Sequence, residues 1–185
     1  MKKIDTSKLV ITGMMAALVM IFTFFKITIP LGPRATMIHM GNVACIMAAI
    51  LLGPYRGGLA AGIGSFLFDL LDPIFITSAP FSLIFKFIMA FICGKIAYSK
   101  NKNGENAKIN IFAAFIGLFF YIILHAAKGM IVNVYFLNMN FIAASVLMSK
   151  SIFFSIINAI LAAFIAVPLS GIIKKYLKRY STLPF

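Results

Sequence analysis

Residues 37–73 read MIHMGNVACIMAAILLGPYRGGLAAGIGSFLFDLLDP, and this stretch decides the fold. It contains two apolar runs, at about Met40 to Leu52 and about Gly57 to Leu71, with only a very short connection between them. Gly53 and Pro54 stop the first run as a helix, and so short a connection forces the second helix to return antiparallel beside it. The stretch therefore predicts a helical hairpin inside a membrane.

The composition extends this prediction to the whole chain. Hydrophobic residues make up 62% of the 185 residues, which exceeds the roughly 45–50% apolar usage of soluble globular domains. A bilayer core about 30 Å thick needs about 20 apolar residues per helix, so this length holds six spans and no soluble catalytic domain. We expect an all-α integral membrane bundle of six transmembrane helices, forming a single domain over residues 1–185 in the cell membrane.

Four further apolar runs complete the six predicted spans. They lie at about Leu9 to Ile29, Ser82 to Tyr98, Ile109 to Lys128 and Ser149 to Ile173. Residues 130–145 are too apolar for a solvated loop and too interrupted for a clear span, so they could form a lid, a re-entrant element or part of a helix. We expect irregular outer loops of this kind to cap a pocket.

The basic residues indicate the orientation in the membrane. The net charge is +13, from 17 Lys and Arg against 4 Asp and Glu. Twelve of the basic residues fall on one side of the predicted layout and five near the other, which predicts that both termini are cytoplasmic. Because this rule explains charges that are dispersed among apolar spans, we reject a nucleic-acid-binding role.

The five outer basic residues lie at or just inside the ends of predicted helices. They are Lys26, Arg34, Lys86, Lys128 and Lys150. Charges inside spans are costly and usually face a bundle interior or a wet cavity, so this cluster predicts a pocket for a negatively charged group. For Lys26 and Lys150, extension of the side chain to the membrane interface is the simpler explanation.

Polar side chains repeat at helical spacing on the fifth and sixth predicted spans. On each helix three of them are spaced i, i+4 and i+7, so they share one face. The two faces consist of Tyr121, His125 and Lys128, and of Ser151, Ser155 and Asn158. His39 and Asn42 open the second span in the same outer zone, which adds them to the predicted pocket.

The third span carries a stripe of small and acidic residues spaced by four, three, four and three. The stripe consists of Gly58, Gly62, Ser65, Asp69 and Asp72. Small residues let another helix approach closely, which is the structural explanation for the glycines. Asp69 needs a partner, and Lys86 or Lys128 could supply one, either as a structural ion pair or as part of the substrate site.

The sequence lacks the motifs of several common classes of enzyme. It contains no GxxxxGKS/T, HExxH or GxSxG motif and only four carboxylates, so neither ATP hydrolysis nor metal-assisted chemistry has its residues. His39, His125 and Asp69 are scattered singly on different helices, which argues against a membrane-embedded enzyme. We therefore expect no enzyme activity, no metal and no cofactor, and energy for uphill transport would come from a partner or an ion gradient.

Residues 37–73 resemble the substrate-binding S component of energy-coupling factor (ECF) transporters, the vitamin-importing relatives of ABC transporters. The shared elements are His39, Gly41 and Asn42, then Leu52, Gly53 and Pro54, then Gly57, Gly58, Gly62 and Gly64, and finally Asp69, Leu70 and Leu71. The size, the six predicted spans, the cytoplasmic termini and the lack of an ATPase agree with this resemblance over essentially the whole chain.

The resemblance implies a vitamin-binding subunit that docks on a membrane scaffold (T) subunit carrying two cytoplasmic ATPase subunits. The small-residue contact that this family makes through its first helix, usually Ala-x-x-x-Ala, corresponds here to Gly13 and Ala17, with Ala16 beside them. ATP hydrolysis in the partner would rotate the S component in the membrane and release the ligand.

We expect the ligand to bind near the outer face. Cations at Arg34, Lys86 and Lys128 would pair with a carboxylate or phosphate of the ligand. Hydrogen bonds would come from His39, Asn42, Tyr121, His125, Asn133 and Asn158, and Asp69 is a further candidate. An anionic vitamin such as pantothenate suits this charge, while pyridoxine-like or pyrimidine ligands are alternatives.

A small secondary transporter or channel without an ATPase partner is the alternative function. Such proteins share the spans and the charges inside the membrane, but they commonly contain internal repeats. Residues 1–99 and 100–185 show no convincing repeat, which counts against this alternative.

Overall fold

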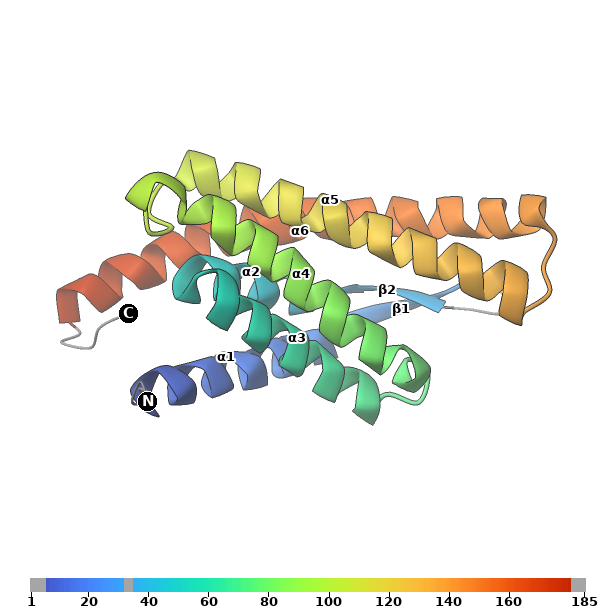
Figure 1. Ribbon diagram of the computed structural model, residues 1–185, viewed down its shortest axis with the longest axis horizontal. Helices are drawn as coiled ribbons and strands as arrows, with labels where there is room; N and C mark the ends of the chain where they lie inside the picture. The colour runs from blue at the N-terminus through green and yellow to red at the C-terminus, as the bar shows by residue number, and fades with distance from the viewer. Residues whose placement is uncertain (1–5, 32–34, 181–185) are drawn as a thin grey trace, which may run out of the picture.

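The computed structural model describes residues 6–31 and 35–180, which form six α-helices and one two-stranded sheet (Figure 1). The helices are α1 (Thr6–Phe24), α2 (Gly41–Leu52), α3 (Pro54–Leu71), α4 (Ala79–Ala97), α5 (Ala107–Ile131) and α6 (Phe141–Tyr180). The strands are β1 (Lys26–Pro30) and β2 (Ala35–His39), and the short helical turns are η1 (Ile76–Ser78), η2 (Ser99–Asn101) and η3 (Val132–Phe136). The predicted helical architecture is confirmed.

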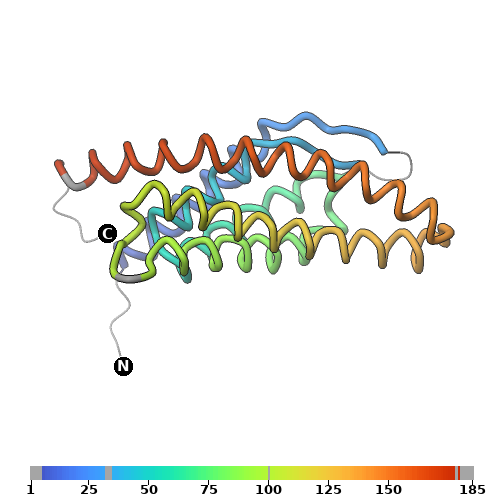
Figure 2. Tube along the Cα trace, turned by 90° about the horizontal axis from the view of Figure 1, so that it is seen from above, coloured from blue at the N-terminus to red at the C-terminus, as the bar shows by residue number. Residues whose placement is uncertain are grey.

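The molecule is elongated, and its two ends differ. The β1–β2 hairpin, the α3–α4 connection and the α5–α6 connection lie toward one end, which we call the hairpin end (Figure 1). Helix α1 begins and helix α6 ends at the opposite end, where the α2–α3 and α4–α5 connections also lie. Figure 2 shows α5 and α6 running side by side and extending beyond the other helices at the hairpin end.

The α2–α3 hairpin predicted from residues 37–73 is present. Helix α2 ends at Leu52 and α3 begins at Pro54, so the connection is a single residue. That residue, Gly53, has a φ of 80°, in the left-handed region that glycine adopts without a steric cost. Pro54 follows as the first residue of α3, where its missing N–H leaves no hydrogen bond unmade.

The segment after α1 is a β-hairpin, which the sequence analysis did not predict. Helix α1 ends at Phe24, so the predicted first span to Ile29 is too long, and the all-α class omits this sheet. Strands β1 and β2 pair antiparallel, with Lys26 opposite His39 and Ile29 opposite Thr36. The β-branched run Ile27 to Ile29 favours an extended backbone once the helix has ended. Two paired strands thus take up most of the first outer loop, which we expected to be irregular.

Residues 130–145 belong mainly to helices, which selects one of the three alternatives left open by the sequence. Helix α5 reaches Ile131 and continues as the π-helical turn η3, and α6 begins at Phe141, earlier than the predicted Ser149. The Asn140 side-chain oxygen accepts a hydrogen bond from the Ala143 N–H at 2.7 Å and so caps α6. Only residues 137–140 connect the two helices.

Among the residues that the structure describes, four helical segments are long and apolar enough to cross a membrane. They are Thr6–Phe24, Ile76–Ala97, Ala107–Phe136 and Phe141–Leu177. Helix α2 has 12 residues, or roughly 18 Å at 1.5 Å per residue, against a hydrocarbon core of about 30 Å. Every residue of α2 is buried among the other elements. Six complete spans and cytoplasmic termini stay predictions.

Helix α3 packs closely against both α4 and α1 because it carries glycine where they meet. A Cβ built on Gly62 would lie 2.7 Å from the Leu83 carbonyl oxygen of α4. One built on Gly64 would lie 2.3 Å from the Ala16 carbonyl oxygen of α1. No larger residue fits at these distances, which supports the close-packing explanation for the glycines of the third span.

Candidate functional site

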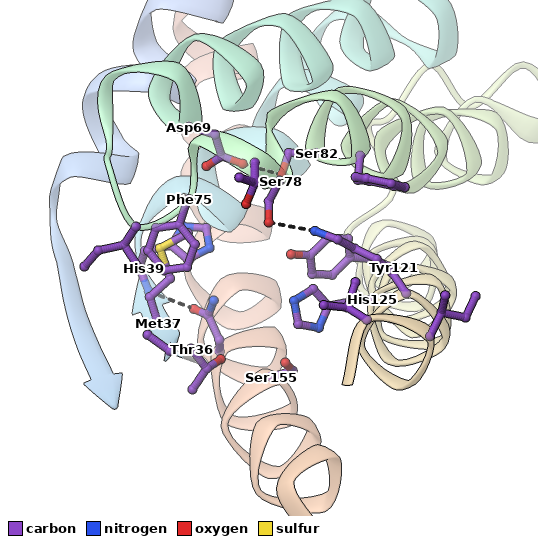
Figure 3. A pocket seen from close by; sticks show the side chains of 18 of the residues that line it. Thr36, Met37, His39, Asp69, Phe75, Ser78, Ser82, Tyr121, His125 and Ser155 are labelled. Carbon is purple, nitrogen blue, oxygen red and sulfur yellow. Dashed lines mark hydrogen bonds between the residues drawn. The ribbon is translucent and has the colours of Figure 1, made fainter. Parts of the chain in front are cut away.

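A cavity of about 660 Å³ lies at the hairpin end, within the range of roughly 300–1,000 Å³ that is typical of small-molecule sites. Its walls come from the β-hairpin, residues 74–82 and helices α5 and α6. Figure 3 shows Met37 and His39 on one side, Tyr121 and His125 from α5 on another, and Ser155 from α6 below them. Segments far apart in the sequence therefore meet around one space.

The cavity brings together most of the residues predicted for the substrate site. Those that line it are His39, Asn42, Asp69, Tyr121, His125, Lys128 and Asn158. Lys86 and Asn133 are buried in the bundle and do not line the cavity. Arg34 lies outside the described residues.

Lys86 lies behind the cavity wall. Its side chain is 4% exposed, and its Nζ donates a hydrogen bond to the Asn42 side-chain oxygen. The same Nζ lies 3.9 Å from the centre of the Tyr121 ring, in a cation–π contact. Lys86 is thus held by two residues that do line the cavity.

His39 and Asn158 join the β-hairpin to α6. The His39 backbone N–H donates to the Asn158 side-chain oxygen at 3.4 Å. Within the described residues, the buried Nδ1 of His39 has no hydrogen-bond partner. His39 lies on β2, outside the helices, and burial with Lys86 and Lys26 nearby holds its pKa well below the usual value. The imidazole is therefore neutral at pH 7.

Asp69 and Lys128 line the cavity from different helices, and both contact serines. The Ser82 hydroxyl donates to Asp69, and the Lys128 Nζ donates to the Ser78 hydroxyl at 2.7 Å (Figure 3). The Lys128 Nζ also lies 4.7 Å from the centre of the Phe81 ring. Ser82 is thus the hydrogen-bonding partner of Asp69, while Lys86 and Lys128 attract it electrostatically.

Lys26 forms an ion pair with Asp72. Its Nζ pairs with the Asp72 carboxylate and lies 4.9 Å and 5.3 Å from the centres of the Phe68 and Phe75 rings. The other Asp72 oxygen accepts from the Ile74 N–H at 3.0 Å. The pair therefore ties β1 to the α3–α4 connection, two walls of the cavity.

The wall formed by residues 74–82 was missed by the sequence analysis. It contributes Ile74, Phe75, Thr77, Ser78, Phe81 and Ser82 to the cavity. The available signal was the position of this segment directly after Asp72 and Pro73, where aromatic and hydroxyl residues alternate without helical spacing. Thr36 and Met37 were missed because their segment was not recognised as a strand.

Two of the three residues predicted for partner contact lie on an open face of α1. Gly13 and Ala17 are exposed, and a Cβ built on Gly13 would have no neighbour within 4 Å. Ala16 is 5% exposed and packs toward α3. The open face therefore includes Gly13 and Ala17 but not Ala16.

Comparisons with known proteins agree with this architecture. The family model described as ECF-type riboflavin transporter, S component, matches residues 3–175. A solved structure of the S component of a bacterial ECF transporter superposes with a TM-score of 0.63 at 23% identity, covering 95% of this chain and 100% of the other. That likeness shows a common fold. A comparison with curated proteins finds no match.

Proposed function

Because the chain belongs to the family of ECF-type riboflavin transporter S components, we propose that it captures riboflavin in the cavity at the hairpin end. Members of this family are substrate-binding membrane subunits of a transporter and not enzymes. The predicted family, the membrane location and the lack of enzyme activity are therefore confirmed. The riboflavin assignment itself rests on the family description and on the lining of the cavity.

The mixed lining of the cavity is the observation that carries this proposal. Phe75, Phe81 and Tyr121 line the cavity, so aromatic rings are available to pack against a flat ring system. Hydroxyl and amide groups alternate with them, including Ser155 and Asn158, and could bind ring heteroatoms or a polyhydroxyl chain. Riboflavin combines a flat aromatic ring system with a chain of hydroxyl groups. The aromatic residues would pack against the ring system, and the polar groups would bind its heteroatoms and the hydroxyl chain.

The charges of the cavity favour riboflavin over the anionic vitamin expected from the sequence. Of the lysines and arginines that the structure describes, only Lys128 lines the cavity, and the Asp69 carboxylate lines it too. Lys86, expected to pair with an anion, is engaged by Asn42 and Tyr121 behind the wall. Lys128 is the observation that keeps a pantothenate-like ligand as the second candidate.

We propose further that the open face of α1 around Gly13 and Ala17 contacts the scaffold subunit. S components of this family work with a T subunit and ATPase subunits, and small exposed residues let another helix approach closely. The proposed contact therefore keeps Gly13 and Ala17, which are exposed, and leaves out Ala16, which is buried.

Riboflavin binding to the purified protein in detergent tests the substrate, because bound flavin loses fluorescence when stacked on aromatic side chains. We expect Tyr121→Ala to weaken binding at least about tenfold, since it removes an aromatic face and a buried contact. Lys108→Met, at the opposite end of the bundle, should leave the Kd unchanged. Pantothenate should not compete.

Two outcomes would contradict different parts of this proposal. Binding of pantothenate with no binding of riboflavin would show that the substrate is wrong while the family assignment stands. Equal losses from Tyr121→Ala and Lys108→Met would show that the ligand does not occupy this cavity. Lys128→Met separates the two vitamins, because it should weaken an anionic ligand far more than a neutral one.

A further inference from the structure

Lys86 fixes the direction in which the Asn42 amide faces the cavity. A lysine ammonium can only donate hydrogen bonds, so the Asn42 atom that contacts its Nζ must be the carbonyl oxygen. The NH₂ group of Asn42 is then left for the cavity, which Asn42 lines. No described residue accepts a hydrogen bond from this NH₂ group, so it is available to a ligand.

Asn158 is oriented in the same way from the other side. The donor here is the backbone N–H of His39, which again can only meet the amide oxygen. Asn158 also lines the cavity, and within the described residues its NH₂ group has no acceptor. Two asparagines from α2 and α6 thus present donors of the same kind to one space.

We propose that Lys86 is a positioning residue that acts through Asn42, so that the site recognises hydrogen-bond acceptor atoms of the ligand. This inference deepens the proposed function and rests on it. The pyrimidine-dione edge of a flavin carries two carbonyl oxygens, which are acceptors for two amide NH₂ groups. A free asparagine can turn its amide over and accept instead, whereas Asn42 beside Lys86 cannot do so without losing a charged hydrogen bond in a buried place.

The position of Lys86 argues against direct contact with the ligand. Its side chain is 4% exposed and its Nζ is enclosed by Asn42 and by the Tyr121 ring at 3.9 Å. Withdrawal of the ammonium from both would leave a buried charge without its partners, which is costly. The lysine therefore acts on the ligand through the side chain it orients.

Asn42→Asp tests this inference with almost no change of shape. The carboxylate keeps its partner Lys86 and gains an ion pair, so the melting temperature should stay equal or rise. The atom that faces the cavity changes from a donor to an acceptor, so the Kd for riboflavin should rise at least about tenfold. Asn106→Asp is the matched control, because Asn106 caps α5 at the opposite end and Asp caps equally well.

A double-variant cycle separates positioning from direct contact. Lys86→Met should weaken riboflavin binding at least about tenfold in the wild-type background but by less than twofold in the Asn42→Ala background. An equal effect of Lys86→Met in both backgrounds would overturn the inference, as would a wild-type Kd in folded Asn42→Asp. If Lys86→Met does not fold, the Asn42→Asp result decides.

The wild-type measurement distinguishes failure of this inference from failure of the proposed function. Wild-type protein that binds riboflavin, together with unaffected binding by Asn42→Asp, contradicts the role of Lys86 alone. Wild-type protein that binds pantothenate and not riboflavin contradicts the proposed substrate. The Lys86→Met and Asn42→Ala cycle is then measured with pantothenate, whose amide and hydroxyl oxygens are also acceptors. A Lys86→Met effect that again depends on the presence of Asn42 supports the role of Lys86.

Discussion

The ion pair between Lys26 and Asp72 should hold two walls of the cavity together, and Asp72→Asn tests this. The substitution keeps an oxygen that can accept from the Ile74 N–H, so the turn after α3 is preserved. The new amide NH₂ group would face the Lys26 ammonium, however, and two donors cannot bond to each other. The variant thus removes the link between β1 and the α3–α4 connection without creating a void.

The size of the effect follows from the burial of the pair. The side chains are 20% exposed for Lys26 and 10% exposed for Asp72, between a surface ion pair and a fully buried one. Surface pairs contribute about 0.2–1 kcal/mol and hydrogen bonds to charged groups about 1.5–3 kcal/mol, so we expect a loss of about 1–2 kcal/mol. If ligand binds only with the β-hairpin in place, the Kd rises roughly 5- to 30-fold.

Fluorescence titration and stopped-flow dissociation with riboflavin measure this loss. We expect Asp72→Asn to raise the dissociation rate by most of that factor and to lower the melting temperature, with Lys26→Met adding little in the double variant because the pair is already broken. Glu105→Gln, in the α4–α5 connection at the other end, is the control. A Kd and a dissociation rate within twofold of wild type would refute the reasoning.

Substitutions at four glycines give further predictions. Gly41→Ala would place a Cβ 2.1 Å from the Thr23 hydroxyl oxygen, so thermal unfolding should show a loss of about 1–3 kcal/mol, with weaker riboflavin binding because His39 must shift. Unchanged stability would show that the α1–α2 junction has more room than described. Gly62→Leu would collide with a backbone oxygen of α4 and should abolish monodisperse protein in gel filtration, whereas Gly171→Leu, with no neighbour within 4 Å, should not. Gly13→Leu should leave stability and riboflavin affinity unchanged but reduce co-purification with the scaffold subunit, and normal complex yield would exclude this face as the contact.

The elements that could be predicted from sequence are those with a local signal. Gly53 and Pro54 stop α2 and start α3 through backbone geometry alone, so their hairpin was predictable. The faces of Tyr121 with His125 and of Asn158 follow from helical spacing, which does not depend on tertiary packing. These residues do line the cavity.

The features that could not be predicted from the sequence depend on contacts between segments far apart in the chain. The run Ile27 to Ile29 is as apolar as the helix before it, and only pairing with β2 makes it a strand. Spacing along α4 places Lys86 near the site but cannot tell whether its ammonium enters the cavity or lies behind Asn42. The partner of Lys26 was hidden for the same reason, since Asp72 lies 46 residues away.

Helix α2 is buried on all sides in the centre of the bundle. Asn42, near its start, borders the cavity, and the Leu51 carbonyl near its end accepts a hydrogen bond from Tyr98, beside the α4–α5 connection. Between the cavity and the other end of the bundle, the described residues form a closely packed, alanine-rich core around α2. This packing favours the expectation that the whole subunit rotates in the membrane to release a ligand from the cavity.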